Sequence, residues 1–173
     1  QFIMANIDVT ALFEMFKEEN KVKDIPEAKQ LKVKKGEIEY KNVYFSYPQR
    51  RGEGFGINKL NLKIKPDSKI ALMGPSGGGK STVVKLLYRL FDLDKGKILI
   101  DGQDISLVSQ ESLRNSMSIV PQEPILFDNT IFFNVAYANP KASKEQVWKA
   151  IKFAQLDRLI EKLPKKEKTI VGE

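Results

Sequence analysis

The run Gly74-Pro75-Ser76-Gly77-Gly78-Gly79-Lys80-Ser81-Thr82, here called the phosphate loop, constrains this chain more than any other stretch. It fits the pattern G-x-x-x-x-G-K-[ST], in which a glycine-rich turn surrounds a phosphate group with backbone N–H groups. Glycines suit such a turn because they lack a Cβ atom and tolerate positive φ, so the backbone can approach an anion closely. The pattern places the Lys80 ammonium on the outer phosphates and the Ser81 hydroxyl on Mg²⁺.

The residues on either side of the phosphate loop have the order that such a loop needs. Residues 69–73 are a short apolar run that predicts a buried parallel strand. Residues 82–90 carry apolar side chains at helical spacing and predict a helix. This helix would begin at the phosphates, where its dipole and free N–H groups favour negative charge. The alternative is an ordinary glycine-rich turn between a strand and a helix, which the complete pattern in this context disfavours.

The composition excludes several kinds of site. The chain has 173 residues, enough for one domain with its own core, and contains no cysteine and no histidine. Disulfides, thiolate metal sites and an imidazole general base are therefore excluded. The net charge of +7 comes from mostly scattered lysines, so we predict a solvated surface and no nucleic-acid partner. The sequence contains no run of 18 apolar residues, so we predict no membrane span in it, and we expect no signal peptide.

Three regions are expected along the chain. Apolar residues at helical spacing in residues 4–17 predict an amphipathic helix, which makes residues 1–20 a connector. Residues 21–35 are charged and show little periodicity, so they predict a tether. The domain proper would cover residues 36–173 and open with two antiparallel strands, at residues 37–47 and 57–65, where polar and apolar residues alternate.

Asp101 is the acid that most resembles a magnesium ligand, because it ends the apolar strand predicted at residues 97–101. Gly102 and Gln103 follow it without a second carboxylate, so we prefer a hairpin in a side sheet over a magnesium-binding strand.

The second half of the chain predicts mostly helices. A short helix is expected at residues 109–114 and a buried strand at residues 117–120. Further helices are expected from residue 131 and at residues 143–154 and 156–163, where Ser143 and Gln146 have the spacing of a capping box. The predicted fold class is therefore α/β, with a P-loop NTPase core, an antiparallel β side sheet and a partial α-helical subdomain.

Residues 36–173 resemble the nucleotide-binding domain of ABC transporters. The likeness rests on the phosphate loop, on Tyr44-Phe45-Ser46-Tyr47-Pro48, and on residues 118–127 around Gln122. It implies that Tyr47 stacks on adenine and that Gln122 reaches Mg²⁺ and the attacking water. It also implies catalytic roles for Lys80 and Gln122 in the in-line attack of water on the γ-phosphate. The ligands would be ATP and Mg²⁺, with Ser81 and Gln122 on the metal. The expected contacts to the nucleotide are Tyr47, Gly74, Pro75, Ser76, Gly77, Gly78, Gly79, Lys80, Ser81, Thr82 and Gln122.

Val120-Pro121-Gln122, Leu126-Phe127, and Thr169 with Val171-Gly172-Glu173 resemble the subfamily B exporters, the group of multidrug-resistance and of mitochondrial and vacuolar half-transporters. This likeness implies a transmembrane domain in the same polypeptide, joined through the first seventeen residues. It also implies a second nucleotide-binding domain, identical or different, and a membrane location with this domain facing the cytoplasm or the mitochondrial matrix. The transported substrate is chosen by membrane helices, so these residues do not identify it.

The family's signature loop, its aspartate strand with the catalytic glutamate, and its switch histidine have no counterpart here, so we expect a domain truncated before the signature motif. Hydrolysis is accordingly expected of the intact protein and not of residues 1–173 alone. One alternative is a soluble ABC-type ATPase of DNA repair or translation, which the amphipathic connector disfavours. Another is a GTPase or small-molecule kinase, suggested only by Asn58-Lys59-Leu60-Asn61, which precedes the phosphate loop. A non-enzymatic structural domain is disfavoured by the phosphate loop itself.

Overall fold

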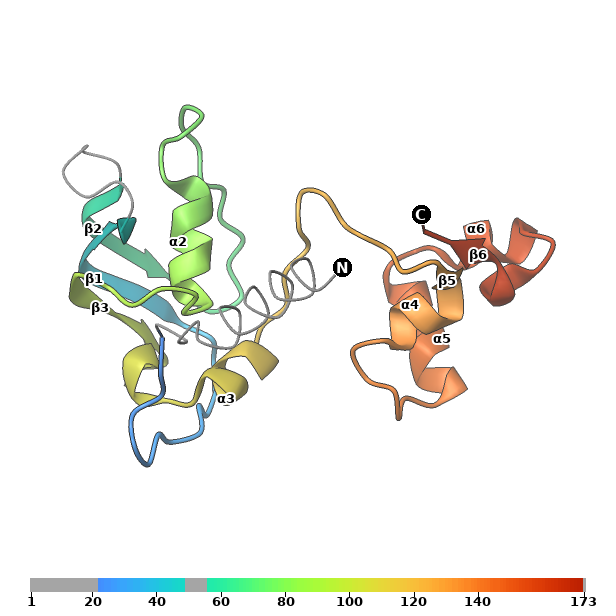
Figure 1. Ribbon diagram of the computed structural model, residues 1–173, viewed down its shortest axis with the longest axis horizontal. Helices are drawn as coiled ribbons and strands as arrows, with labels where there is room; N and C mark the ends of the chain where they lie inside the picture. Colours follow the sequence, from blue (N-terminus) through green and yellow to red (C-terminus); the bar gives the residue numbers. More distant parts are fainter. Residues whose placement is uncertain (1–21, 49–55, 173) are drawn as a thin grey trace, which may run out of the picture. The chain divides into compact units, whose positions relative to one another are not determined.

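The computed structural model describes residues 22–48 and 56–172, and the predicted amphipathic helix of residues 4–17 lies outside them. The described chain forms two compact units, divided between Ser118 and Ile119, whose helices and strands are labelled in Figure 1. No helix in this described part of the chain is both long enough and apolar enough to cross a bilayer.

The first unit is built on an antiparallel sheet with the strand order β2-β1-β3-β4. These strands are β1 (Ile38–Ser46), β2 (Gly56–Ile64), β3 (Lys95–Ile100) and β4 (Gln103–Asp104). Tyr40 in the central strand β1 faces Leu62 on one side and Ile98 on the other. The predicted side sheet and the hairpin from β3 to β4 are therefore confirmed.

A bulge in β1 brings three of its side chains to the core. Strict alternation would place Tyr40 and Val43 on opposite faces, yet both are buried together with Phe45. The register shifts between Tyr40 and Val43, where Asn42 has φ of 48° and donates its N–H to Asn61 Oδ1 at 2.9 Å. The extra residue turns the strand locally, as bulges do, so the apolar side chains stay on the inner face.

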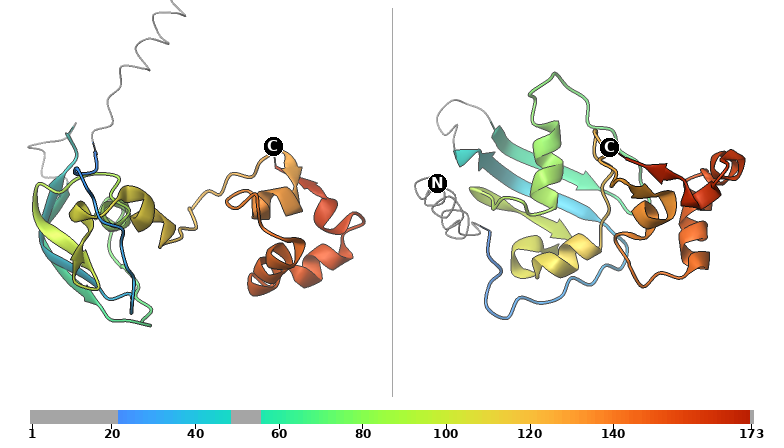
Figure 2. Two further views of the ribbon diagram at one scale, coloured as in Figure 1. Left: turned by 90° about the horizontal axis from the view of Figure 1, so that it is seen from below. Right: turned by 45° about the vertical axis from the view of Figure 1, so that its right-hand side comes forward.

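Helix α2 (Lys80–Leu87) lies across this inner face, as the right-hand view of Figure 2 shows. Its Val83 and Leu86 join the core of the sheet, and the buried Tyr40 hydroxyl donates to Val83 O at 3.1 Å. Burial raises the pKa of Tyr40 well above its usual range, so the phenol stays protonated and keeps this bond. The helix ends three residues before the predicted residue 90, because Arg89 takes the left-handed conformation at φ of 48°.

Residues 22–35 have neither helix nor strand, as expected of a tether, but they are fixed to the first unit. Lys29 forms an isolated parallel bridge with Val108, and Leu31 N–H donates to Ser112 Oγ at 2.9 Å. Ser112 belongs to helix α3 (Gln110–Asn115), which follows the 3-10 turn Ile105–Leu107. Ser109 caps α3 by accepting from Ser112 N–H at 3.3 Å, so the predicted short helix is confirmed with Ser109 as its N-cap.

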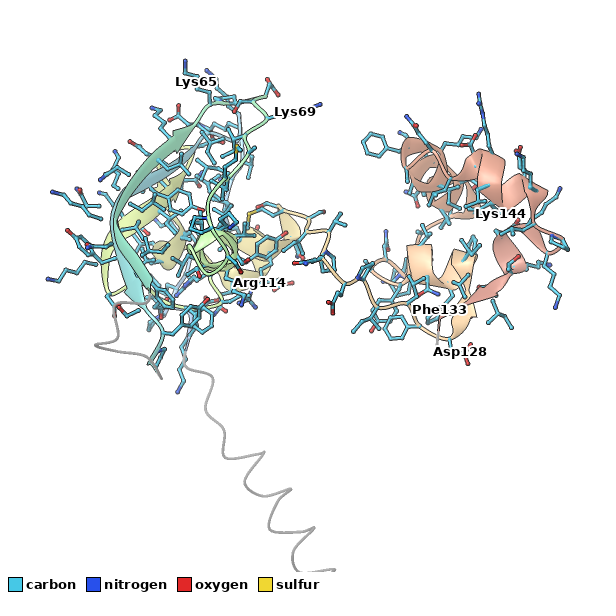
Figure 3. The ribbon with its side chains drawn as sticks, turned by 90° about the horizontal axis from the view of Figure 1, so that it is seen from above. Lys65, Lys69, Arg114, Asp128, Phe133 and Lys144 are labelled. Carbon is cyan, nitrogen blue, oxygen red and sulfur yellow. The ribbon has the colours of Figure 1, made fainter. Side chains whose placement is uncertain are left out.

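The predictions of a buried parallel strand at residues 69–73 and of a buried strand at residues 117–120 are wrong. Neither segment is a strand in the structure, and Met73 and Val120 are 92% and 90% exposed. An apolar run becomes a strand only where a neighbouring segment completes its backbone hydrogen bonds, and no residue in the described ranges pairs with either one. Lys65 and Lys69, labelled in Figure 3, mark the turn at which the chain leaves β2 for residues 69–73.

The second unit is mainly helical. Its elements are β5 (Asn129–Thr130), α4 (Ile131–Ala136), α5 (Lys144–Phe153), α6 (Asp157–Lys162), the 3-10 turn Lys166–Lys168 and β6 (Ile170–Val171), with β5 and β6 paired antiparallel. Val147, Ile151 and Ile160 form its small core. The capping box predicted for α5 is confirmed. Ser143 N–H donates to Gln146 Oε1 at 2.8 Å, and Gln146 N–H donates to Ser143 Oγ at 3.3 Å.

Candidate phosphate-binding site

The phosphate loop forms an exposed turn held by its own backbone. Gly78 N–H donates to Pro75 O at 3.1 Å, which closes the turn. Gly77 and Gly79 have φ of 77° and 82°, in the left-handed region that side chains disfavour. A Cβ on Gly79 would lie 3.0 Å from Ile57 Cδ1, and one on Gly78 would lie 3.0 Å from Pro75 O. The glycines therefore serve both the conformation of the turn and its packing.

The loop leads directly into the N-terminus of α2, which has no side-chain cap. Gly79 is the N-cap and offers no hydroxyl or carboxylate, and the first turn carries no acid. The N–H groups of Lys80, Ser81 and Thr82 have no acceptor among the described residues, as is general for the first turn of a helix. With the positive end of the helix dipole, these donors favour an anion at this position.

The Lys80 ammonium lies over the loop. Its Nζ donates to Gly74 O at 2.8 Å and to Pro75 O at 2.6 Å. An ammonium group has three N–H donors, so one remains for a further acceptor. Lys80 thus adds a charge beside the free N–H groups of α2, and an anion in the loop would compete with the two carbonyls for this charge.

Tyr47 also belongs to this site. It follows the last residue of β1, and its hydroxyl lies 3.1 Å from Thr82 Oγ1 in the first turn of α2. The ring is half-buried and packs nearly perpendicular to Phe45 and Phe91. The structure therefore brings Tyr47 next to the first turn of α2, and its contact with adenine remains a prediction.

Gln122 lies in the second unit, exposed, on residues 119–128, which form neither helix nor strand. Its predicted approach to Mg²⁺ therefore stays a prediction. Ser81 is exposed, and its hydroxyl has no hydrogen bond to the described residues. The described residues hold no group of three or more acids that could bind a metal. Mg²⁺ is commonly held by one or two protein oxygens together with phosphate oxygens and waters, and the exposed Ser81 hydroxyl is an oxygen that fits such a role.

Asp101 has a structural role in the first unit. Its carboxylate accepts the N–H groups of Lys34, Lys35 and Gly36 on Oδ2 at 2.7, 2.9 and 3.0 Å, and that of Glu37 on Oδ1 at 3.0 Å. These bonds, with the one from Lys34 foremost, hold the pKa of Asp101 well below its ordinary value. The preferred interpretation as a hairpin residue fits this geometry, since its acceptor sites are engaged by the backbone.

The GTPase alternative, which depended on a possible guanine-binding motif at residues 58–61, also loses its basis. Asn61 lies in β2, where its side-chain amide donates to Asn42 Oδ1 at 3.2 Å and to Lys59 O at 3.3 Å. These bonds belong to the bulge of β1, so the Asn58-Lys59-Leu60-Asn61 run serves the sheet.

Sequence reasoning missed two parts of this region. These are Phe91, which lies beside Tyr47, and the buried Arg89. Neither residue belongs to a sequence motif that would indicate its position. Phe91 comes four positions after the last residue of α2. Its apolar side chain predicts a position in the core and gives no sign of its contact with Tyr47.

A closed glycine turn that leads directly into an uncapped helix N-terminus is the feature shared by the class of P-loop nucleotide-binding domains. The chain belongs to the ABC transporter family, whose profile, described as "ABC transporter", matches residues 57–172.

Among curated proteins, the chain is 42% identical over 167 residues to ATP-binding cassette sub-family B member 6 of Homo sapiens, covering 96% of this chain and 20% of that protein. It is 40% identical over 184 residues to the mitochondrial iron-sulfur clusters transporter ATM1 of Candida albicans, covering 96% and 24%. It therefore spans only about a fifth to a quarter of the length of these relatives. The predicted likeness to subfamily B half-transporters is confirmed.

Among solved structures, the chain matches a bacterial Atm1-family ABC exporter with ATP bound at a TM-score of 0.87 and 39% identity, covering 98% of this chain and 29% of that one. The α/β P-loop fold class is therefore confirmed. These matches give no support to the alternative of a soluble ATPase in DNA repair or translation.

Proposed function

We propose that this chain binds ATP together with Mg²⁺ as the nucleotide-binding part of an exporter. The observation that carries the proposal is the phosphate loop, closed by its own backbone and continuous with three free N–H groups at the start of α2. Lys80 adds the only ammonium group of the loop. N–H donors at a helix N-terminus, together with an ammonium group, favour an anionic ligand such as a triphosphate tail over a neutral one.

Each residue of the site has a distinct part in this proposal. The loop N–H groups bind and orient the phosphates, Lys80 neutralises the charge of the outer ones, and Tyr47 offers a ring face to the purine. Ser81 and Gln122 are the proposed protein ligands of Mg²⁺, which would supply charge neutralisation across the phosphate oxygens.

The transport-coupled activity belongs to the intact protein. There we propose that a second nucleotide-binding domain completes the site, that ATP is hydrolysed, and that a transmembrane domain of the same polypeptide uses the resulting motion. The domain would face the cytoplasm or the mitochondrial matrix. Support comes from the Candida albicans relative, which is named as a transporter, and from the solved structure, which is an exporter with ATP bound.

Equilibrium dialysis of residues 1–173 with labelled ATP and Mg²⁺ tests the binding step. Lys80→Ala should weaken binding by about 10- to 100-fold, the usual worth of a hydrogen bond to a charged group. Lys85→Ala is the matched control, because Lys85 lies exposed on the same helix and its loss changes the net charge equally. Weak binding that is equal in wild type and both variants would contradict the proposal.

A further inference from the structure

A hydrogen bond joins the base-facing and the phosphate-facing parts of the candidate site. Tyr47 OH and Thr82 Oγ1 are 3.1 Å apart, although 35 positions separate the two residues. Thr82 is only 7% exposed and stands in the first turn of α2, among the free N–H groups. The bond therefore ties the Tyr47 ring to the same turn of helix that faces the phosphates.

Two aromatic rings fix the plane of Tyr47. The ring centroids of Phe45 and Phe91 lie 4.9 and 5.3 Å from that of Tyr47, at interplanar angles of 79° and 84°. Phe45 and Phe91 also contact each other, with centroids 5.4 Å apart, so the three rings form one cluster. Because both neighbours stand nearly perpendicular to Tyr47, neither forms a parallel stack on it. A planar base could therefore still stack on the half-buried ring.

We infer that Thr82 and Phe91 are positioning residues, which hold the Tyr47 ring at a fixed place relative to the phosphate loop and thereby set how much a purine base adds to binding. The inference rests on the proposed ATP binding. Thr82 holds the hydroxyl end of the ring, and Phe91 holds its side.

The physical effect is preorganisation. A tyrosine that is already held in one orientation loses little side-chain freedom when a base stacks on it, whereas a free tyrosine must be ordered by the ligand. Loss of either contact should therefore weaken the base-dependent part of the affinity by about three- to tenfold. The part of the affinity that comes from the phosphates should depend on the phosphate loop alone, so loss of either contact should leave it unchanged.

The test compares the dissociation constants of ATP and inorganic tripolyphosphate, both with Mg²⁺, for residues 1–173. Phe91→Leu keeps an apolar side chain but removes the ring, and it should weaken ATP about three- to tenfold while tripolyphosphate is unaffected. Phe153→Leu is the matched control, because Phe153 is exposed on α5, and it should change neither constant.

A double-mutant cycle tests the hydrogen bond. Thr82→Val and Tyr47→Phe should each lower the preference for ATP over tripolyphosphate, and combining them should lower it no further. Thr82→Ser keeps a hydroxyl and should restore the preference. Thermal unfolding of each variant checks that it is folded. If Phe91→Leu does not fold, the preference of Tyr47→Phe for ATP over tripolyphosphate is the deciding measurement, because this substitution removes only one oxygen.

Three outcomes have distinct meanings. Variants that are folded and lose ATP and tripolyphosphate equally, or lose neither, would overturn the positioning role. A Thr82→Val effect that persists fully in the Tyr47→Phe background would overturn the role of the hydrogen bond. Failure of the wild-type chain to bind either ligand would instead refute the proposed function on which the inference rests.

Discussion

Arg89 donates from Nη1 to Asp24 Oδ1 at 3.1 Å, joining two residues that are 65 positions apart in the chain. The guanidinium side chain is only 5% exposed, and it also donates to Lys23 O at 2.9 Å and to Val108 O at 3.1 Å. Asp24 in turn accepts from Gln110 N–H at the start of α3. Arg89 thus connects the start of the described chain, the residues after α2 and the approach to α3.

Arg89→Met should therefore destabilise the first unit by about 2–4 kcal/mol, since it leaves buried carbonyls without their donor and removes the cation beside Asp24. Urea unfolding followed by circular dichroism measures the loss, and amide hydrogen exchange should speed up in residues 22–36. Arg158→Met is the control, because Arg158 is exposed on α6 and has no hydrogen bond to the described residues. An equal, small effect of both substitutions would contradict the central role of Arg89.

The features that the sequence predicted well are local ones. The turn of the phosphate loop, the capping box of Ser143 and Gln146 and the presence of a strand at β1 depend on residues only a few positions apart, so a short window contains their cause. The apolar runs at residues 69–73 and 117–120 look equally regular but fail as strands, because a strand needs a partner that the window does not show.

The long-range contacts could not be predicted for the same reason. Nothing near Tyr47 in the sequence indicates that its hydroxyl meets Thr82, and nothing near Asp24 indicates Arg89. The first contact depends on how the sheet and α2 pack together, and the second on how residues 22–35 pack beside the residues that follow α2. The family was therefore easier to predict than these contacts, because its motifs are local in the sequence and the contacts depend on the fold.

Asp101 should make stability depend on pH at the acid end. Its pKa in the folded chain lies below the ordinary 3.8, chiefly because the N–H of Lys34 donates to the carboxylate. A carboxylate of this kind stabilises the fold fully above its unfolded pKa, and the stabilisation is lost as the pH falls toward the folded value. Asp101→Asn should therefore lower the unfolding midpoint at pH 7, because an amide accepts fewer of these bonds.

The measurement is the difference in unfolding midpoint between wild type and Asp101→Asn, from pH 7 down to pH 2. Other acids titrate in both chains, so the difference isolates Asp101. It should shrink as the pH falls below about 4. A difference that stays constant over this range would show that the four backbone bonds do not depend on the charge of Asp101.

Ser143→Ala should destabilise the second unit by about 1 kcal/mol, the usual cost of losing an N-cap. The substitution leaves Gln146 N–H without its acceptor at the start of α5. Thermal unfolding should show a lower midpoint, and amide exchange should speed up at the first turn of α5. Ser118→Ala serves as the control, because Ser118 is exposed and has no hydrogen bond to the described residues. A loss of stability in the control as large as that of Ser143→Ala would remove the case for the cap.

Gly79→Ala should impair both stability and ligand binding. At φ of 82° an alanine costs about 1–2 kcal/mol, and its Cβ would also lie 3.0 Å from Ile57 Cδ1. Gly102→Ala separates backbone strain from the site. Gly102 has a similar φ of 77° in the hairpin between β3 and β4, and a Cβ there would meet nothing within 4 Å. Both variants should lose stability in urea unfolding, Gly79→Ala at least as much as Gly102→Ala, but only Gly79→Ala should weaken ATP binding in equilibrium dialysis. Equal loss of binding in the two variants would mean that the turn at Gly79 has no special part in holding phosphate.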